Sequence, residues 1–100
     1  MKRYKIINTL KAQRDLDSIS DYTVINWGVK QHDKYMDGIK KRVLYLQNKP
    51  LNFAKKHDEI ATGLCSVNYK SHKIFFMVSD DAVRILRVLH NSSDWQTKQF

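Results

Sequence analysis

The sequence is poor in cysteine, proline and glycine, and these shortages exclude several classes of protein. Its single cysteine, Cys65, cannot form an intramolecular disulfide. One proline and three glycines do not fit a collagen-like or low-complexity chain. The first residues are basic and are not followed by an apolar run, so we expect no secretory signal. No stretch approaches the roughly 20 apolar residues of a membrane span. We therefore expect a cytoplasmic protein without a membrane segment.

The chain has the size and apolar content of one folded unit. It contains 100 residues, of which 42% are hydrophobic and 11% are aromatic. A chain of this length builds one modest core and is too short for two. We expect a single domain spanning residues 1–100.

Charge is unevenly distributed along the sequence. The 18 Lys and Arg residues outnumber the 10 Asp and Glu residues, which gives a net charge of +8, and residues 1–57 hold 13 of the basic and five of the acidic groups. A cationic surface attracts nucleic acid, anionic protein segments or anionic lipid, and it does not choose among them. A protein that is simply basic remains the alternative.

Apolar periodicity predicts a strand and two helices in the first half. Residues 4–7 read as a short strand, and Thr9 can cap a helix over residues 10–26. Gly28 can end that helix with a left-handed residue. A second helix then continues to Pro50, and so short a link makes the two helices antiparallel neighbours. Residues 51–63 show no period and read as a charged surface loop.

Three runs rich in β-branched and aromatic residues follow, at residues 64–69, 72–79 and 82–90. Lys70 with Ser71, and Asp80 with Asp81, read as the two turns between them. The predicted fold is therefore α+β with the order β-α-α-β-β-β, in which a helical hairpin packs on a small, mostly antiparallel sheet.

Two tight turns fix a pairing register and sort the side chains onto two faces. The face expected to meet the helices carries Cys65, Val67, Tyr69, His72, Ile74, Phe76, Val78, Val83, Ile85, Arg87 and Leu89. The other face carries Leu64, Ser66, Asn68, Lys73, Phe75, Met77, Arg84, Leu86, Val88 and His90. We expect Phe75, Met77, Leu86 and Val88 to form an exposed patch for a partner. Alternatively, the neighbours of the first strand or the C-terminal tail cover them.

The polar residues offer few catalytic constellations. No pair of histidines has metal-ligand spacing, and His72 and His90 fall on opposite faces in this register, so we expect neither a metal site nor a cofactor. Cys65 reads as a small buried hydrophobe. No glycine-rich phosphate loop and no Ser-His-Asp context can be specified.

A metal-free ribonuclease needs only a general acid, a general base and cations around the scissile phosphate. The candidates for those roles are His72, Arg84, Arg87 and His90, with Lys70 and Lys73 nearby. No glutamate lies on the predicted sheet to act as a base. Alternatively, His72 merely flanks a turn and Arg87 pairs with a carboxylate such as Asp94.

The ordered set of elements resembles the RelE/ParE superfamily of bacterial toxins over essentially the whole chain. The segments that carry the resemblance are Asp15, Leu16, Ile19 and Tyr22 in the first helix, Trp27 and Gly28, Tyr35, residues 58–60, Gly63 and Leu64, Tyr69, residues 72–76, residues 85–90 and Asp94. The His90-x-x-x-Asp94 ending resembles the ParE branch in particular.

Resemblance to ParE implies a growth-arresting toxin of a type II toxin-antitoxin system that poisons DNA gyrase and is silenced by a cognate antitoxin with an acidic amphipathic tail. It implies no catalytic residues. We assign antitoxin binding to Phe75, Met77, Leu86, Val88 and Trp27, and target binding to Arg87, His90, Asp94 and Trp95.

Two alternatives stay open. Resemblance to the RelE branch implies a ribosome-dependent mRNA endonuclease, although the aromatic residues beyond His90 are only Trp95 and Phe100. A binding module without toxicity is the other. The Asn91-Ser92-Ser93 segment and Cys65 depart from the ParE pattern, which leads to the hypothesis of a less active or differently targeted member.

Overall fold

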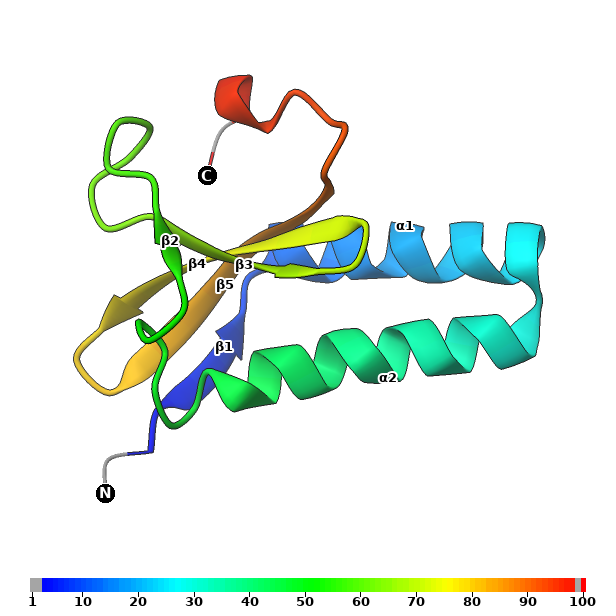
Figure 1. Ribbon diagram of the computed structural model, residues 1–100, viewed down its shortest axis with the longest axis horizontal. Coiled ribbons are helices and arrows are strands. Elements are labelled where there is room, and N and C mark those ends of the chain that lie inside the picture. The colour runs from blue at the N-terminus through cyan, green and yellow to red at the C-terminus, as the bar shows by residue number, and fades with distance from the viewer. Residues whose placement is uncertain (1–2, 99) are drawn as a thin grey trace.

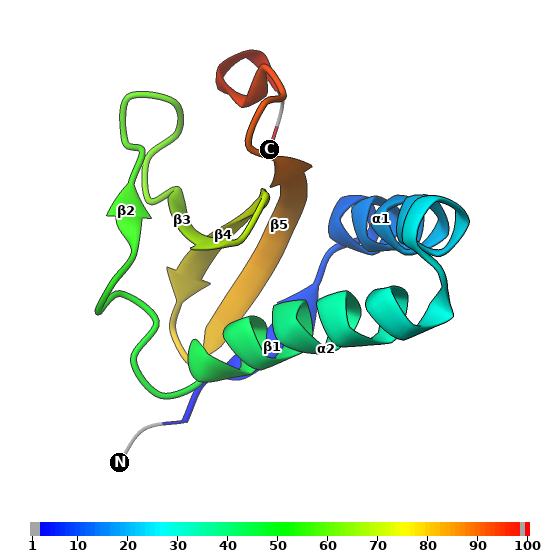
Figure 2. The same cartoon turned by 45° about the vertical axis from the view of Figure 1, so that its right-hand side comes forward.

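Two helices lie on one side of a five-stranded mixed sheet in the computed structural model, which describes residues 3–98 and 100 (Figures 1 and 2). The elements are β1 (Lys5–Asn8), α1 (Leu10–Trp27), α2 (Val29–Tyr45), β2 (Lys55–Lys56), β3 (Cys65–Tyr69), β4 (His72–Ser79), β5 (Ala82–His90) and the short 3-10 helix η1 (Trp95–Thr97). The strands are ordered β1-β5-β4-β3-β2; β1 pairs with β5 in parallel, and the three other pairings between these strands are antiparallel. The predicted α+β class is confirmed.

The first helix begins and ends where the sequence predicts. The Thr9 hydroxyl accepts a hydrogen bond from the backbone N–H of Ala12 at 3.2 Å and donates one to the Ile85 carbonyl at 2.8 Å, so the cap also ties α1 to β5. Gly28 joins the helices with φ +87° and an extended ψ of 169°, which differs from the expected left-handed helical cap. No helix in the described part of the chain is long and apolar enough to cross a membrane.

The predicted register holds for β3 with β4 and for only half of β5. Cys65 lies opposite Phe76. Along β5, Ile85 also lies opposite Phe76, but Arg87 lies opposite Phe75, so Leu86 is an extra, bulged residue. Because one extra residue reverses the alternation of side chains, Val88, Leu89 and His90 change face.

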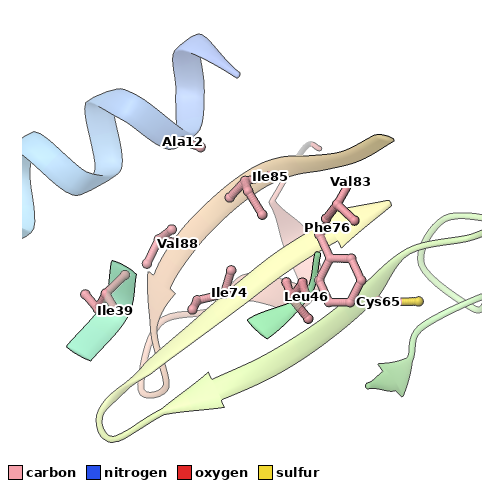
Figure 3. Packing of buried hydrophobic residues seen from close by; sticks show 9 residues of the cluster. All are labelled: Ala12, Ile39, Leu46, Cys65, Ile74, Phe76, Val83, Ile85 and Val88. Atoms are coloured by element: carbon pink, nitrogen blue, oxygen red, sulfur yellow. The ribbon is translucent and has the colours of Figure 1, made fainter. Parts of the chain in front are cut away.

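The bulge corrects three predicted positions. Val88, expected on the face away from the helices, belongs to the core beneath them, where Figure 3 shows it on β5 alongside the β4 residue Ile74. Leu89, expected beneath the helices, belongs to the cluster on the opposite face. His72 and His90 lie directly opposite each other, so the prediction that they occupy different faces is wrong.

Two cores sandwich the sheet. The core under the helices contains Ala12, Ile39, Leu46, Cys65, Ile74, Phe76, Val83, Ile85 and Val88 (Figure 3). The second contains Leu64, Phe75 and Leu89, packed against Ile60, Ala61, Met77, Leu86, Trp95 and Phe100. Full burial of a side chain such as phenylalanine stabilises the fold by about 1.5–3 kcal/mol.

The exposed patch predicted for a partner is therefore wrong for two of its four members. Phe75 is 0% exposed and Val88 is 2% exposed. Met77 and Leu86 are partly buried. The alternative is confirmed for Phe75, because the C-terminal residues Trp95 and Phe100 cover it with ring centroids at 5.4 and 4.7 Å.

Residues 51–63 are only partly the surface loop that was predicted. Lys55 and Lys56 pair with β3 as the edge strand β2. The next residue, His57, is 1% exposed and lies 2.8 Å from the hydroxyl of Ser66. A two-residue strand is too short to show any period in the sequence, which explains why it was missed.

Candidate functional site

An open cleft lies between the far ends of the helical hairpin and the turn that joins β3 to β4. It has a volume of about 340 Å³. Its walls are Tyr22, Thr23, Trp27, Gln31, Tyr35, Ser71, His72 and His90. We call it the histidine cleft. Figure 1 shows the β3–β4 turn reaching toward the two helices.

The two histidines of the cleft are a cross-strand pair. Their ring centroids are 5.3 Å apart and the ring planes are nearly perpendicular, at 82°. The adjacent pair is joined by a hydrogen bond from the Asn91 N–H to the Ser71 carbonyl at 2.8 Å. Because hydrogen-bonded and non-hydrogen-bonded pairs alternate, His72 and His90 form a non-hydrogen-bonded pair, in which side chains approach most closely.

Each imidazole is held through its Nδ1 atom. The Tyr35 hydroxyl lies 2.6 Å from Nδ1 of His72. Nδ1 of His90 accepts the backbone N–H of Ser92 at 3.0 Å and lies 2.6 Å from the Ser92 hydroxyl. The Asn91-Ser92-Ser93 segment, noted in the sequence as a departure from the ParE pattern, thus orients His90.

Burial shifts the titration of two groups in the cleft. It lowers the pKa of His72, and the neighbouring His90 lowers it further. Burial likewise raises the pKa of Tyr35. Both changes keep these side chains uncharged near neutral pH, so they act in the cleft as polar, neutral groups.

Arg87 forms an ion pair with Asp15 of α1. Its Nε and Nη2 atoms donate to the two carboxylate oxygens of Asp15 at 2.7 and 3.0 Å. The carboxylate also accepts the backbone N–H of Val88 at 3.0 Å. The hydrogen bonds to Asp15 raise the pKa of Arg87. The predicted partner Asp94 is wrong, because Asp15, 72 residues away in the chain, occupies that role.

The four residues predicted for a nuclease do not converge. His72 and His90 line the histidine cleft. Arg84 pairs with Met77 and lies with it on the opposite face of the sheet, where it is exposed. Arg87 is held by Asp15. Arg84 is thus separated from the candidate acid and base, and the Arg87 guanidinium is already occupied by a carboxylate.

The other predicted target-binding residues lie near the C-terminus. Trp95 packs inward, with ring centroids 5.1 Å from His57 and 5.4 Å from Phe75. Asp94 is exposed and precedes η1. His90 is also exposed. Their roles toward a target stay predictions; His90 and Asp94 are exposed, whereas Trp95 is half-buried.

The end of the helical hairpin, where α1 meets α2, points away from the sheet (Figure 1). Apolar side chains are exposed there. These residues, the hairpin tip, are Tyr22, Val24, Ile25, Trp27 and Val29. Trp27, predicted to bind an antitoxin, is 68% exposed. The tip thus offers the accessible apolar surface that the sequence placed on the sheet.

Sequence reasoning missed several residues of the cleft. Tyr22 and Tyr35 were not assigned to any site, and Ser71 was read only as a turn residue. The hydroxyl groups of these three residues were the one feature of the sequence that could have indicated a polar site. Within residues 3–98 and 100, no group of three or more His, Cys, Asp or Glu side chains is placed to hold a metal.

Comparison with protein families gives one match over most of the chain. The family described as the ParE toxin of the type II toxin-antitoxin system parDE matches residues 6–95.

Curated relatives agree with this match. A Toxin ParE1 of Mycobacterium tuberculosis is 30% identical over 84 residues, which cover 83% of this chain and 85% of the relative. A Toxin ParE1 of Caulobacter vibrioides is 30% identical over 92 residues, with 92% of each chain covered.

Solved structures share the fold. A chain of the chromosomal ParDE toxin-antitoxin system from P. aeruginosa superposes with a TM-score of 0.77 at 26% identity, covering 88% of this chain and 96% of the other. A chain of the RelBE2 toxin-antitoxin complex from Mycobacterium tuberculosis gives a TM-score of 0.70 at 22% identity, covering 93% and 97%. The second likeness concerns the fold alone.

Proposed function

This chain belongs to the ParE toxin family of type II toxin-antitoxin systems, and from that membership we propose that it poisons DNA gyrase and is silenced by a cognate antitoxin. Family membership supports the toxin role. The gyrase target follows from the resemblance to the ParE branch, whose terminal run His90-x-x-x-Asp94 this chain shares.

The positions of the residues predicted for a nuclease favour a binding inhibitor over an RNA-cleaving enzyme. Arg84 lies on the face of the sheet opposite His72 and His90, and the Arg87 guanidinium is occupied by Asp15. General acid-base cleavage of a phosphodiester needs cations around the same phosphate as the acid and base. Inhibition by binding needs only an exposed, complementary surface.

The exposed apolar surfaces also support an antitoxin partner. Besides the hairpin tip, a groove of about 490 Å³ runs between the helices beside β1. Its apolar lining includes Ile6, Leu16, Met36, Ile39, Val43 and Leu44, with Lys40 among its polar residues. An amphipathic segment can bury its apolar face in such a groove while its acidic residues meet the cationic surface. Silencing would then be tight and salt-sensitive.

A gyrase assay tests the proposal directly. The purified chain is added to gyrase in supercoiling and DNA-cleavage reactions, with and without the protein encoded by the neighbouring reading frame. We expect loss of supercoiling, accumulation of cleaved DNA, and reversal of both by the antitoxin. In the same assay, Asp94→Ala should reduce inhibition, whereas Lys11→Ala, an exposed change on α1, should not. Normal gyrase activity at saturating toxin would reject the gyrase target.

A ribosome-dependent endonuclease is the second candidate, and the pairing of His72 with His90 is the observation that favours it. Two imidazoles in one cleft can divide the roles of general acid and general base. The test is incubation with mRNA on programmed ribosomes. Cleaved mRNA together with unaffected gyrase would establish this alternative, and intact mRNA would eliminate it.

A further inference from the structure

The histidine cleft presents a hydrogen-bond donor whose position can be deduced from the backbone. A backbone N–H can only donate, so Nδ1 of His90, which accepts the Ser92 N–H, carries no proton. The neutral ring must then carry its proton on Nε2. Among the described residues, no side chain or carbonyl bonds to that Nε2.

The second histidine offers a matching donor. The Tyr35 hydroxyl lies 2.6 Å from Nδ1 of His72. When the phenol donates to that nitrogen, the His72 proton lies on Nε2. Two imidazole N–H groups from rings 5.3 Å apart thus serve one cleft, and an oxyanion can accept from both.

The walls of the cleft can also bind a flat aromatic ring next to an oxyanion held by the two imidazoles. Trp27 is 68% exposed and Tyr22 is 62% exposed, and both line the cleft with the histidines. Exposed aromatic rings are platforms on which nucleic acid bases stack. A volume of about 340 Å³ lies within the range of small-ligand sites.

The cleft is also open at one end. Tyr22, His72 and His90 line a second hollow of about 420 Å³ that continues past Ser18, Ile19 and Val88. Its one carboxylate, Asp15, is neutralised by Arg87. A linked chain of nucleotides can therefore pass through, and the net charge of +8 favours a polyanion.

We propose that the histidine cleft binds single-stranded nucleic acid, with a phosphate between His72 and His90 and a base stacked on Trp27 or Tyr22. The site shares His90 with the predicted target-binding residues, but this activity goes beyond gyrase inhibition, because it involves the free toxin and a nucleic acid without a second protein.

Direct binding to the full chain tests the site. The probes are a short fluorescein-labelled oligothymidylate read by anisotropy, and adenosine 5′-monophosphate, inorganic phosphate, adenosine and polyglutamate as competitors. We expect the mononucleotide to compete better than phosphate or adenosine alone, because it fills both halves of the site. Polyglutamate should compete less well than the nucleotide at equal charge. Equal competition by polyglutamate would refute the phosphate and base assignment.

Matched variants separate the cleft from the general positive charge. His90→Phe keeps a ring of similar size but removes the donor, and Trp27→Ala removes the stacking platform. Each should weaken oligonucleotide binding about tenfold, as expected for loss of one hydrogen bond to a charged group or one base stack. The controls His32→Gln, on the other side of the hairpin, and Ile25→Ala, at the tip, should bind as the parent chain does.

Both test residues are exposed, so thermal melting of each variant should match the parent. If all four variants bind equally, binding comes from charge alone and the proposed site is wrong. Because no gyrase is present, a failed gyrase assay does not affect this result, and failure here leaves gyrase inhibition untouched.

Discussion

Asp15 joins α1 to β5, and its removal should cost a large share of the stability. Its carboxylate receives two hydrogen bonds from the Arg87 guanidinium and one from the backbone N–H of Val88, just after the bulge in β5. The Arg87 and Asp15 side chains are 19% and 15% exposed. The substitution Asp15→Ala leaves a nearly buried cation and a buried N–H without an acceptor.

The expected loss follows from those groups. An unsatisfied buried donor costs about 1–3 kcal/mol, and a hydrogen bond to a charged group is worth about 1.5–3 kcal/mol. Because water reaches a fifth of the Arg87 side chain, the loss of its bonds takes the lower end of that range. We expect Asp15→Ala to lower the free energy of unfolding by about 3 kcal/mol, against a total of about 5–15 kcal/mol for a typical domain.

Urea denaturation of a double-mutant cycle measures the effect. The cycle comprises the parent, Asp15→Ala, Arg87→Ala and the double variant, and the coupling energy should be at least about 1 kcal/mol. Asp17→Ala, on an exposed position of the same helix, is the control and should change stability by less than about 0.5 kcal/mol. A coupling energy near zero would mean that the ion pair behaves as a solvated surface contact and does not stabilise the fold.

Three further predictions concern the two cores. Burial lowers the pKa of His57, so the unfolded chain takes up a proton first as pH falls below about 6.5, and stability present above that pH is lost on acidification. Urea midpoints between neutral and acidic pH should fall less steeply in His57→Gln; an unchanged slope would contradict this. Gly38→Ala should destabilise the chain by about 1–3 kcal/mol despite better helix propensity, because the added methyl group would overlap the Tyr69 phenol; a raised melting temperature would show that the ring moves freely. Trp95→Ala should cost about 2 kcal/mol by uncovering the second core, measured by urea denaturation beside the exposed control Gln96→Ala; equal midpoints would mean that the tail adds no stability.

The sequence predicted well those features that depend on local patterns. Apolar periodicity located both helices, and β-branched runs separated by short polar turns located β3, β4 and β5. Lys70 and Asp80 take positive φ values of 48° and 52° in those turns, which fixes the tight connections on which the register was based. The β3–β4 pairing then followed correctly.

The errors arise where one residue or one distant contact decides the outcome. Nothing in the local sequence of β5 distinguishes Leu86 as a bulge, and the faces of Val88, Leu89 and His90 depended on it. The true partner of Arg87 is set by how α1 crosses the sheet, which a single sequence does not specify. The histidine pair was missed for the first of these reasons and the ion pair for the second.

The parallel pairing of β1 with β5 also determines when the toxin can complete its sheet during synthesis. Lys5 pairs with Ala82, so the first strand to be made cannot pair until the last strand has been made. At about 5–20 residues per second, the ribosome needs about 4–15 seconds to make the intervening chain. Until β5 is made, α1 lacks the strand against which it packs. A nascent chain halted before β5 therefore lacks the Asp15 ion pair, the histidine cleft and the core residues Val83, Ile85, Val88 and Leu89 together. Translation has to reach the final strand before the predicted target-binding residues exist.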